Sequence, residues 1–168
     1  MKCCLYAIVA LIYYGITAAA FADETPFLQS LAGDWIGGGM MKRSTSSPPI
    51  NLDCNFKTQA SGVALSMKGT CRGMIVVTRA VSANIKANGT QYAGTYIGPS
   101  GGVSGLQGRR NGDAINLAVQ WSRIINGDRS ATMTIQRVDD NAIRIRTVDK
   151  DPASGQQVVT SEINLRRN

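Results

Sequence analysis

Histidine is absent from the sequence. It is the most frequent general base and metal ligand in proteins, and the only side chain whose unperturbed pKa lies near neutral pH. Without histidine, a serine nucleophile needs a lysine partner, and no Ser-x-x-Lys motif stands at a predicted strand-to-helix junction. These absences predict a protein that is not an enzyme, has no metal site and carries no cofactor.

Phosphate-binding loops and long amphipathic helices are also missing. The glycine runs at residues 37–39 and 101–102 are not followed by a helix, as a phosphate-binding loop requires, so they are interpreted as strand or turn glycines. Acidic residues are the remaining catalytic candidates. The pair at residues 139–140 and the residues Asp149 and Asp151 fall in predicted turns, where aspartate is favoured for turn geometry.

The first 22 residues have the composition of a secretory signal. Lys2 precedes an apolar run that begins at Leu5, and the small-residue pattern at residues 20–22 stands directly before Asp23. An uncleaved membrane anchor is the alternative, because the apolar run approaches the length of a membrane span. We expect a cleaved signal peptide over residues 1–22, a single domain over residues 23–168, and a periplasmic or secreted protein.

Cysteine is scarce, and two of the four cysteines lie in the leader. The other two, Cys54 and Cys71, flank a stretch in which apolar and polar residues alternate on both sides of Gly62-Val63. A two-residue turn there, with glycine at the first position as a type II′ turn requires, puts the two cysteines directly opposite each other. In an oxidising compartment this arrangement predicts a hairpin disulfide between Cys54 and Cys71. The same register sets Phe56 opposite Gly69.

Further turn signals recur along the chain. Asn88-Gly89 and Asn111-Gly112 are preferred type I′ pairs, and we expect them to form the loops of two more hairpins. The first register sets Ile85 opposite Tyr92, and the second sets Leu117 opposite Leu106. A two-residue turn at Asn126-Gly127 does not fit the apolar pattern.

The stretch around that third asparagine–glycine pair therefore needs another solution. We expect a longer loop or a β-bulge between Trp121 and Ala131. A short loop at residues 139–141 then aligns Ile135 with Ile145.

Successive short hairpins with almost no helix indicate an all-β meander. Closure into an up-and-down antiparallel β-barrel of about 8–10 strands removes its exposed edges. A two-sheet sandwich is the alternative, but it needs long crossover connections that the sequence does not contain. The chain is therefore expected to form a lipocalin-like closed barrel.

The apolar faces of the predicted strands define an interior that is either a filled core or a ligand cavity. Glycines at 69, 94, 102 and 108 share this face and are expected to leave space beside the larger side chains. Arg137 has the same parity and is predicted at the barrel mouth, facing an anionic head group or solvent. The candidate cavity residues are Trp35, Phe56, Met67, Tyr92, Tyr96, Leu106, Leu117, Trp121, Met133 and Arg137.

The start of the domain resembles the lipocalins and the wider calycin group. Gly33 and Trp35 match their Gly-x-Trp signature, which stands after a short helical turn at the start of the first strand, with the Trp closing the barrel end. Their long C-terminal helix is not evident here. The Gly-rich strands and hairpin cysteines also resemble a group of small exported bacterial barrels.

A weaker resemblance is to the small periplasmic inhibitors of secreted metalloproteases. It rests on Leu31, Gly33 and Trp35, followed by a disulfide-closed hairpin. Those inhibitors act through an N-terminal segment, which here corresponds to residues 23–27. This chain is longer than that family.

The formal net charge of +7 suits either simple solubility or contact with anionic envelope surfaces. The basic residues are scattered and no base-stacking motif accompanies them, which weighs against nucleic acid. The sequence predicts an exported, non-enzymatic binding protein for a small apolar or amphipathic, lipid-like ligand. The alternative is a protein–protein module, either a protease inhibitor or an envelope structural or adhesion factor, and peripheral membrane contact through the positive charge is a third hypothesis.

Overall fold

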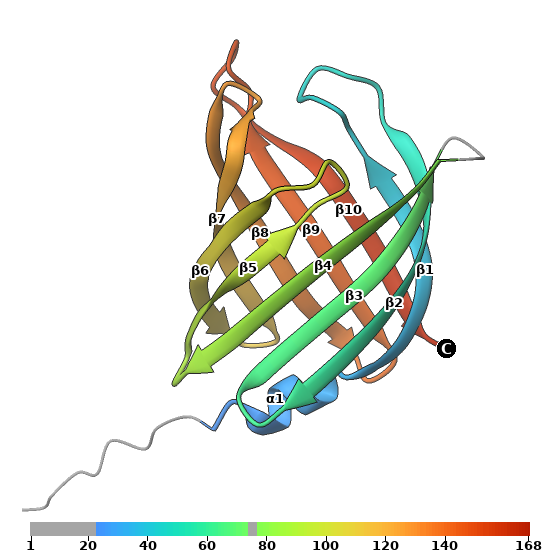
Figure 1. Cartoon of the computed structure of the whole chain (residues 1–168), viewed down its shortest axis with the longest axis vertical. Helices are drawn as coiled ribbons and strands as arrows, with labels where there is room; N and C mark the ends of the chain where they lie inside the picture. Colours follow the sequence, from blue (N-terminus) through green and yellow to red (C-terminus); the bar gives the residue numbers. More distant parts are fainter. Residues whose placement is uncertain (1–22, 74–76) are drawn as a thin grey trace, which may run out of the picture.

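The computed structural model describes residues 23–73 and 77–168. The part of the chain that it describes contains one short helix followed by ten strands (Figure 1). These elements are α1 (Thr25–Ser30), β1 (Gly33–Met41), β2 (Ile50–Ser61), β3 (Ala64–Gly73), β4 (Val77–Asn88), β5 (Gln91–Ile97), β6 (Val103–Asn111), β7 (Ala114–Ile125), β8 (Asp128–Asp139), β9 (Ala142–Lys150) and β10 (Gln157–Arg167).

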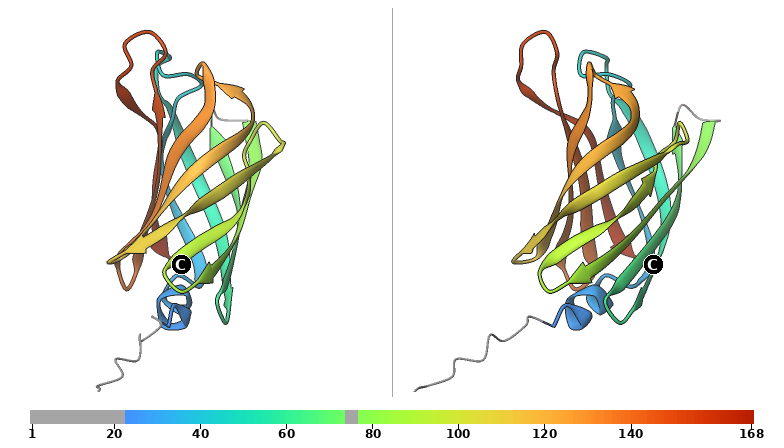
Figure 2. Two further views of the ribbon diagram at one scale, coloured as in Figure 1. Left: turned by 90° about the vertical axis from the view of Figure 1, so that its left-hand side faces the viewer. Right: turned by 60° about the vertical axis from the view of Figure 1, so that its left-hand side comes forward.

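The ten strands form one closed barrel in which each strand is antiparallel to both neighbours, and β1 closes the ring against β10. The prediction of an all-β up-and-down barrel is confirmed, and the sandwich alternative is wrong. Figures 1 and 2 show α1 across one end of the barrel, which we call the floor. The opposite end, which we call the open end, carries the loop at residues 42–49 and the turns that follow β5, β7 and β9. The predicted signal peptide lies outside the described residues.

The β2–β3 hairpin has the predicted register throughout. Cys54 pairs with Cys71 and the two form a disulfide with a Cα–Cα distance of 4.1 Å. Gly62 begins the turn with a φ of +53°, as a type II′ turn requires. A Cβ on Gly69 would lie 2.5 Å from the ring of Phe56, so the ring fills the space above this glycine.

The β4–β5 hairpin differs from the prediction by two residues. Its loop is Gly89-Thr90 rather than Asn88-Gly89, and Ile85 pairs with Gly94 instead of Tyr92. Gly89 has a φ of +54° at the first loop position, so this turn uses glycine in the same way as the β2–β3 turn. The chain thus forms a turn that needs positive φ only at its first position, in place of the expected type I′ Asn-Gly turn.

The β6–β7 hairpin shows the same shift, because its loop is Gly112-Asp113 rather than Asn111-Gly112. Arg110 therefore pairs with Ile115, on the inner face of the sheet. The Arg110 side chain is partly buried and donates a hydrogen bond to Glu24 at the floor.

The irregularity predicted after Trp121 is present. The β7–β8 register shifts between Gln120 and Ile125, and Asn126 then turns the chain with a φ of +53°. The expected alignment of Ile135 with Ile145 is also confirmed.

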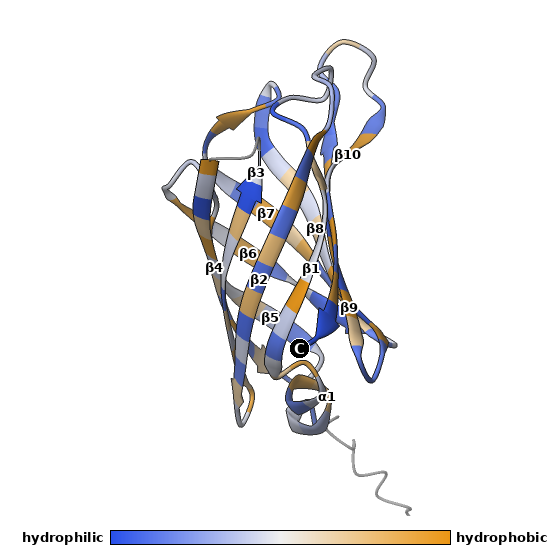
Figure 3. Cartoon of the chain, turned by 90° about the vertical axis from the view of Figure 1, so that its right-hand side faces the viewer, coloured by the Kyte–Doolittle hydropathy of each residue, from blue (hydrophilic) through white to orange (hydrophobic). Residues whose placement is uncertain are grey.

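Large apolar side chains fill the lower and middle parts of the barrel. Leu28 and Leu31 of the helical segment are fully buried beneath the strands. Polar and apolar residues alternate along the strands in Figure 3, which is the pattern of a sheet with one solvated face. The inward-facing residues with relative exposure of 1 % or less include Trp35, Leu65, Leu106, Ile115, Leu117, Ile135, Ile143 and Leu165.

Candidate binding site

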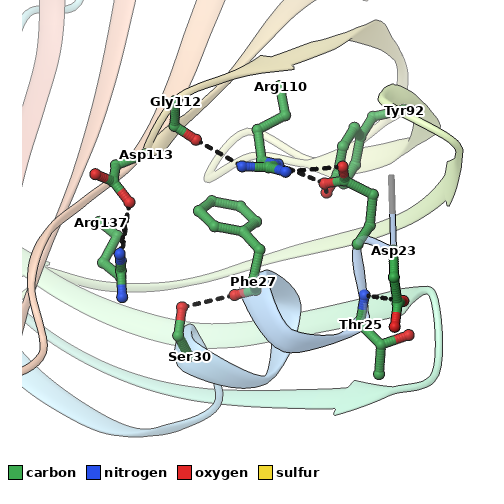
Figure 4. A network of polar contacts seen from close by, with 10 residues as sticks. Asp23, Thr25, Phe27, Ser30, Tyr92, Arg110, Gly112, Asp113 and Arg137 are labelled. Carbon is green, nitrogen blue, oxygen red and sulfur yellow. Dashed lines mark hydrogen bonds and ion pairs between the residues drawn. The ribbon is translucent and has the colours of Figure 1, made fainter. Parts of the chain in front are cut away.

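The floor of the barrel is held by a buried carboxylate. Glu24 is 1 % exposed and accepts hydrogen bonds of 2.6 Å from the Tyr92 hydroxyl and 2.6 Å from Nε of Arg110. A second bond of 3.0 Å joins the Arg110 guanidinium to the other carboxylate oxygen. The guanidinium also lies 4.7 Å from the centre of the Phe27 ring, above the helix (Figure 4).

These contacts determine the ionisation states of Glu24 and Tyr92. Burial raises the pKa of Glu24, but the hydrogen bonds from Arg110 and Tyr92 and the Arg110 charge lower it by more, so the pKa falls below its ordinary value. Burial and the hydrogen bond to Glu24 raise the pKa of Tyr92 well above its usual range. The floor is therefore an ion pair with a neutral phenol as second donor, which suits anchoring rather than proton transfer.

A second cation seals the other side of the floor. The Arg167 guanidinium lies 4.3 Å from the Trp35 ring centre and donates a 2.7 Å hydrogen bond to the carbonyl of Ala32. The indole of Trp35 in turn donates to the carbonyl of Leu31 at 3.2 Å. The helix is thus tied to both β1 and β10, and this end of the interior is closed.

Arg137 also belongs to the floor end and not to the open end. It donates a 2.7 Å hydrogen bond to Asp113 and lies 3.5 Å from Asp140. These two carboxylates, on neighbouring turns, account for its charge. The structure therefore removes Arg137 from the group of residues expected to meet a ligand head group.

Burial of the inward-facing side chains is less uniform towards the open end. Side chains near the floor are almost fully buried, whereas the inward-facing Val81 and Tyr96 are only partly buried. At the open end the inner wall on β4 and β5 is therefore partly accessible, while Trp121 and Asp149 remain buried. This upper part of the inner wall is the candidate binding site.

Two aromatic residues and one carboxylate form the most distinctive part of this wall. The rings of Tyr96 and Trp121 lie 6.2 Å apart with an interplanar angle of 58°. The indole nitrogen of Trp121 donates a 3.3 Å hydrogen bond to Asp149, which also accepts a bond from the Thr160 hydroxyl. Asp149 itself is only 3 % exposed.

Tyr96 presents a neutral donor to this region. Burial raises the pKa of its phenol to about 12. Among the described residues the hydroxyl has no hydrogen-bond partner, and it is not one of the fully buried polar atoms. It is therefore available to bond to a ligand or to water.

Only part of the predicted cavity set meets at the open end. Tyr96 and Trp121 lie there, whereas Trp35 and Tyr92 belong to the floor. The other predicted members, Phe56, Met67, Leu106, Leu117 and Met133, are buried core residues.

Sequence reasoning missed Asp149 and Thr160. Asp149 lies in β9 and not in a turn, and its signal is the alternation of Ile143, Ile145 and Thr147 that leads to it on the inner face. Thr160 stands at a register shift in β10, which the sequence pattern does not reveal.

Two of the glycines expected to leave space in the interior have a different role. A Cβ on Gly94 or Gly108 would meet the backbone carbonyl of Asn84 or Asn116 in the neighbouring strand. These glycines allow close approach of two strands. They do not mark room for a ligand.

Hollows also occur on the outer surface. One of about 640 Å³ extends over the outer faces of β1 to β5, and Ile36, Lys57, Lys68 and Ile97 contribute to its lining. Another of about 770 Å³ lies beside the loop at residues 42–49. Within residues 23–73 and 77–168, no three acidic or cysteine side chains converge as a metal site would require, and no helix has the length and apolarity to span a bilayer.

No family model and no curated protein matches this chain. Among solved structures it is similar to the crystal structure of Rv2717c from M. tuberculosis, with a TM-score of 0.61 and 16 % sequence identity. The match covers 85 % of this chain and 98 % of that one. At this identity the likeness shows a shared fold, so the chain is a closed antiparallel barrel of the same architecture.

Proposed function

We propose that this chain is an exported, non-enzymatic binding protein that holds a small, largely apolar ligand in the open half of its barrel. The observation that carries the proposal is the contrast between the two ends. The floor is sealed by buried apolar and ion-paired groups, whereas the upper wall combines partly exposed apolar residues with the free hydroxyl of Tyr96. A mostly apolar wall with a few convergent polar groups is typical of ligand sites.

The resemblance to lipocalins supports the same reading, because Trp35 closes the floor here as the Gly-x-Trp tryptophan does in that group. The hairpin disulfide supports export, since such bonds persist in oxidising compartments. The inhibitor alternative, which uses residues 23–27, receives less support. Glu24 and Phe27 of that segment are buried in the floor, so their release would open the barrel.

The proposal is tested with the exported protein and phenylnaphthylamine, an uncharged apolar probe whose fluorescence rises on transfer from water. Ala131 faces the interior opposite Val119, and Ala118 on the outer face of β7 is its matched control. We expect saturable probe binding that Ala131→Phe weakens about tenfold or more and that Ala118→Phe leaves unchanged. Absence of saturable binding, or equal binding by both variants, would contradict the proposal. Native mass spectrometry of the purified protein would detect a retained natural ligand.

A further inference from the structure

The buried carboxylate of Asp149 forms no ion pair within the described residues. Its two hydrogen-bond donors, the Trp121 indole and the Thr160 hydroxyl, are both neutral. None of the ion pairs in that part of the chain involves it, in contrast to Glu24 at the floor, which is paired with Arg110. Removing a carboxylate from water without a cation beside it is costly, so a missing cation is the simplest completion of the site.

Two aromatic rings lie beside this carboxylate. Tyr96 and Trp121 are tilted at 58° with centroids 6.2 Å apart, and the Trp121 indole bonds to Asp149. Aromatic faces carry negative quadrupole potential, and tryptophan attracts cations most strongly. The carboxylate that accepts the indole N–H adds electron density to the same ring. Asp149 and Trp121 would therefore both attract a cation to this position.

Two arginines at the open end form no ion pair with Asp149. Arg129 donates a 2.8 Å hydrogen bond to the carbonyl of Trp121, and its side chain is exposed to solvent. Arg79 pairs with Cys71 on the inner face of β4, close to the open end, and is also exposed. Either arginine is a rival to an external cation, and the test below separates the two cases.

We infer that the ligand of the open half carries an organic cation of the alkylated ammonium class, which sits against Tyr96 and Trp121 in front of Asp149. This inference rests on the proposed function and names the chemistry of its ligand. A weakly hydrated alkylammonium suits aromatic faces better than a metal ion, which needs several oxygen ligands. Its alkyl part would extend along the partly exposed Val81 and Ile145.

The test compares choline with its uncharged carbon isostere dimethylbutanol by titration calorimetry on the exported protein. The two molecules share shape and differ in charge. We expect choline to bind about tenfold tighter or more. Asp149→Asn should remove this preference, and Asp53→Asn, which neutralises an exposed carboxylate on the outer face of β2, should leave it unchanged.

Folding of each variant is checked by circular dichroism. If Asp149→Asn does not fold, Trp121→Phe provides the second variant, because it keeps a ring but removes the indole N–H, and it should lower the choline preference. Equal binding of the two probes, or choline binding that survives both substitutions, would overturn the inference. Phenylnaphthylamine separates the two proposals: if it binds while choline does not, the cation inference fails and the proposed function stands. If Arg129 neutralises Asp149 in solution, choline binds only after Arg129→Gln, which also overturns the inference for the native chain.

Discussion

Glu24 and Arg110 are joined by two hydrogen bonds, of 2.6 and 3.0 Å, across 86 positions of sequence. This contact ties the residue directly before α1 to the inner face of β6. Together with the burial of Leu28 and Leu31, it makes the helix a fixed floor of the barrel.

Substitution Glu24→Gln should destabilise the barrel. It removes the negative charge that Arg110 and Tyr92 face and leaves a partly buried guanidinium without its counter-ion. We expect a loss of about 2 kcal/mol in the free energy of unfolding, measured by urea titration. The matched control is Asp53→Asn, whose exposed carboxylate lies 3.7 Å from Arg72, and it should change stability by less than about 0.5 kcal/mol. Equal effects of the two substitutions would show that the floor ion pair contributes nothing.

The same pair should make stability depend on pH in the acid range. The folded pKa of Glu24 is lowered from its ordinary value of 4.5, because the hydrogen bonds from Arg110 and Tyr92 outweigh the effect of burial. A lowered carboxyl pKa contributes stability above the unfolded pKa and loses it as pH falls through the folded one. The difference in urea midpoint between native protein and Glu24→Gln should thus be full at neutral pH. It should shrink as pH falls below about 4.5. A difference that grows on acidification would contradict this assignment.

Local patterns predicted most of the fold because strand alternation and turn chemistry act over short distances. The stretch around Gly62-Val63 is the clearest case, since its register followed from alternation and the glycine turn, and its disulfide from that register. The two Asn-Gly hairpins were displaced by two residues, which preserves the buried face. The predicted inner and outer faces of these two hairpins were therefore correct, although every predicted cross-strand pair in them was wrong.

The site was harder to predict because it depends on contacts between distant strands. Tyr96 and Trp121 were identified by their parity, but nothing in the sequence paired Trp121 with Asp149 on β9. Glu24 was missed for the same reason. Its partner Arg110 is 86 positions away, and no local pattern in the sequence connects the two residues.

The disulfide should contribute a large share of the stability. Cys54 and Cys71 close a loop with a sequence separation of 17. In the chain-entropy model this is worth about 3 kcal/mol. The double substitution Cys54→Ala with Cys71→Ala should lower the free energy of unfolding by that amount, as measured by urea titration. Reductant should bring the native protein towards the double variant and leave the variant unchanged; a reductant effect on the variant would show that another cause is involved.

Two glycines on β6 should respond in opposite ways to the same substitution. A Cβ on Gly108 would run into the backbone carbonyl of Asn116, which cannot move without separating β6 from β7. We expect Gly108→Ala to cost about 2–3 kcal/mol in unfolding free energy. Gly105 faces outward, and the nearest atom to its added Cβ would be the Gln120 Cβ at 3.7 Å, an ordinary contact. Gly105→Ala should leave stability unchanged or raise it by about 0.5 kcal/mol, because alanine restricts the unfolded chain. Urea titration of both variants measures the difference, and similar losses for the two would mean that the barrel tolerates no side chain on this strand for reasons other than the close approach at Gly108.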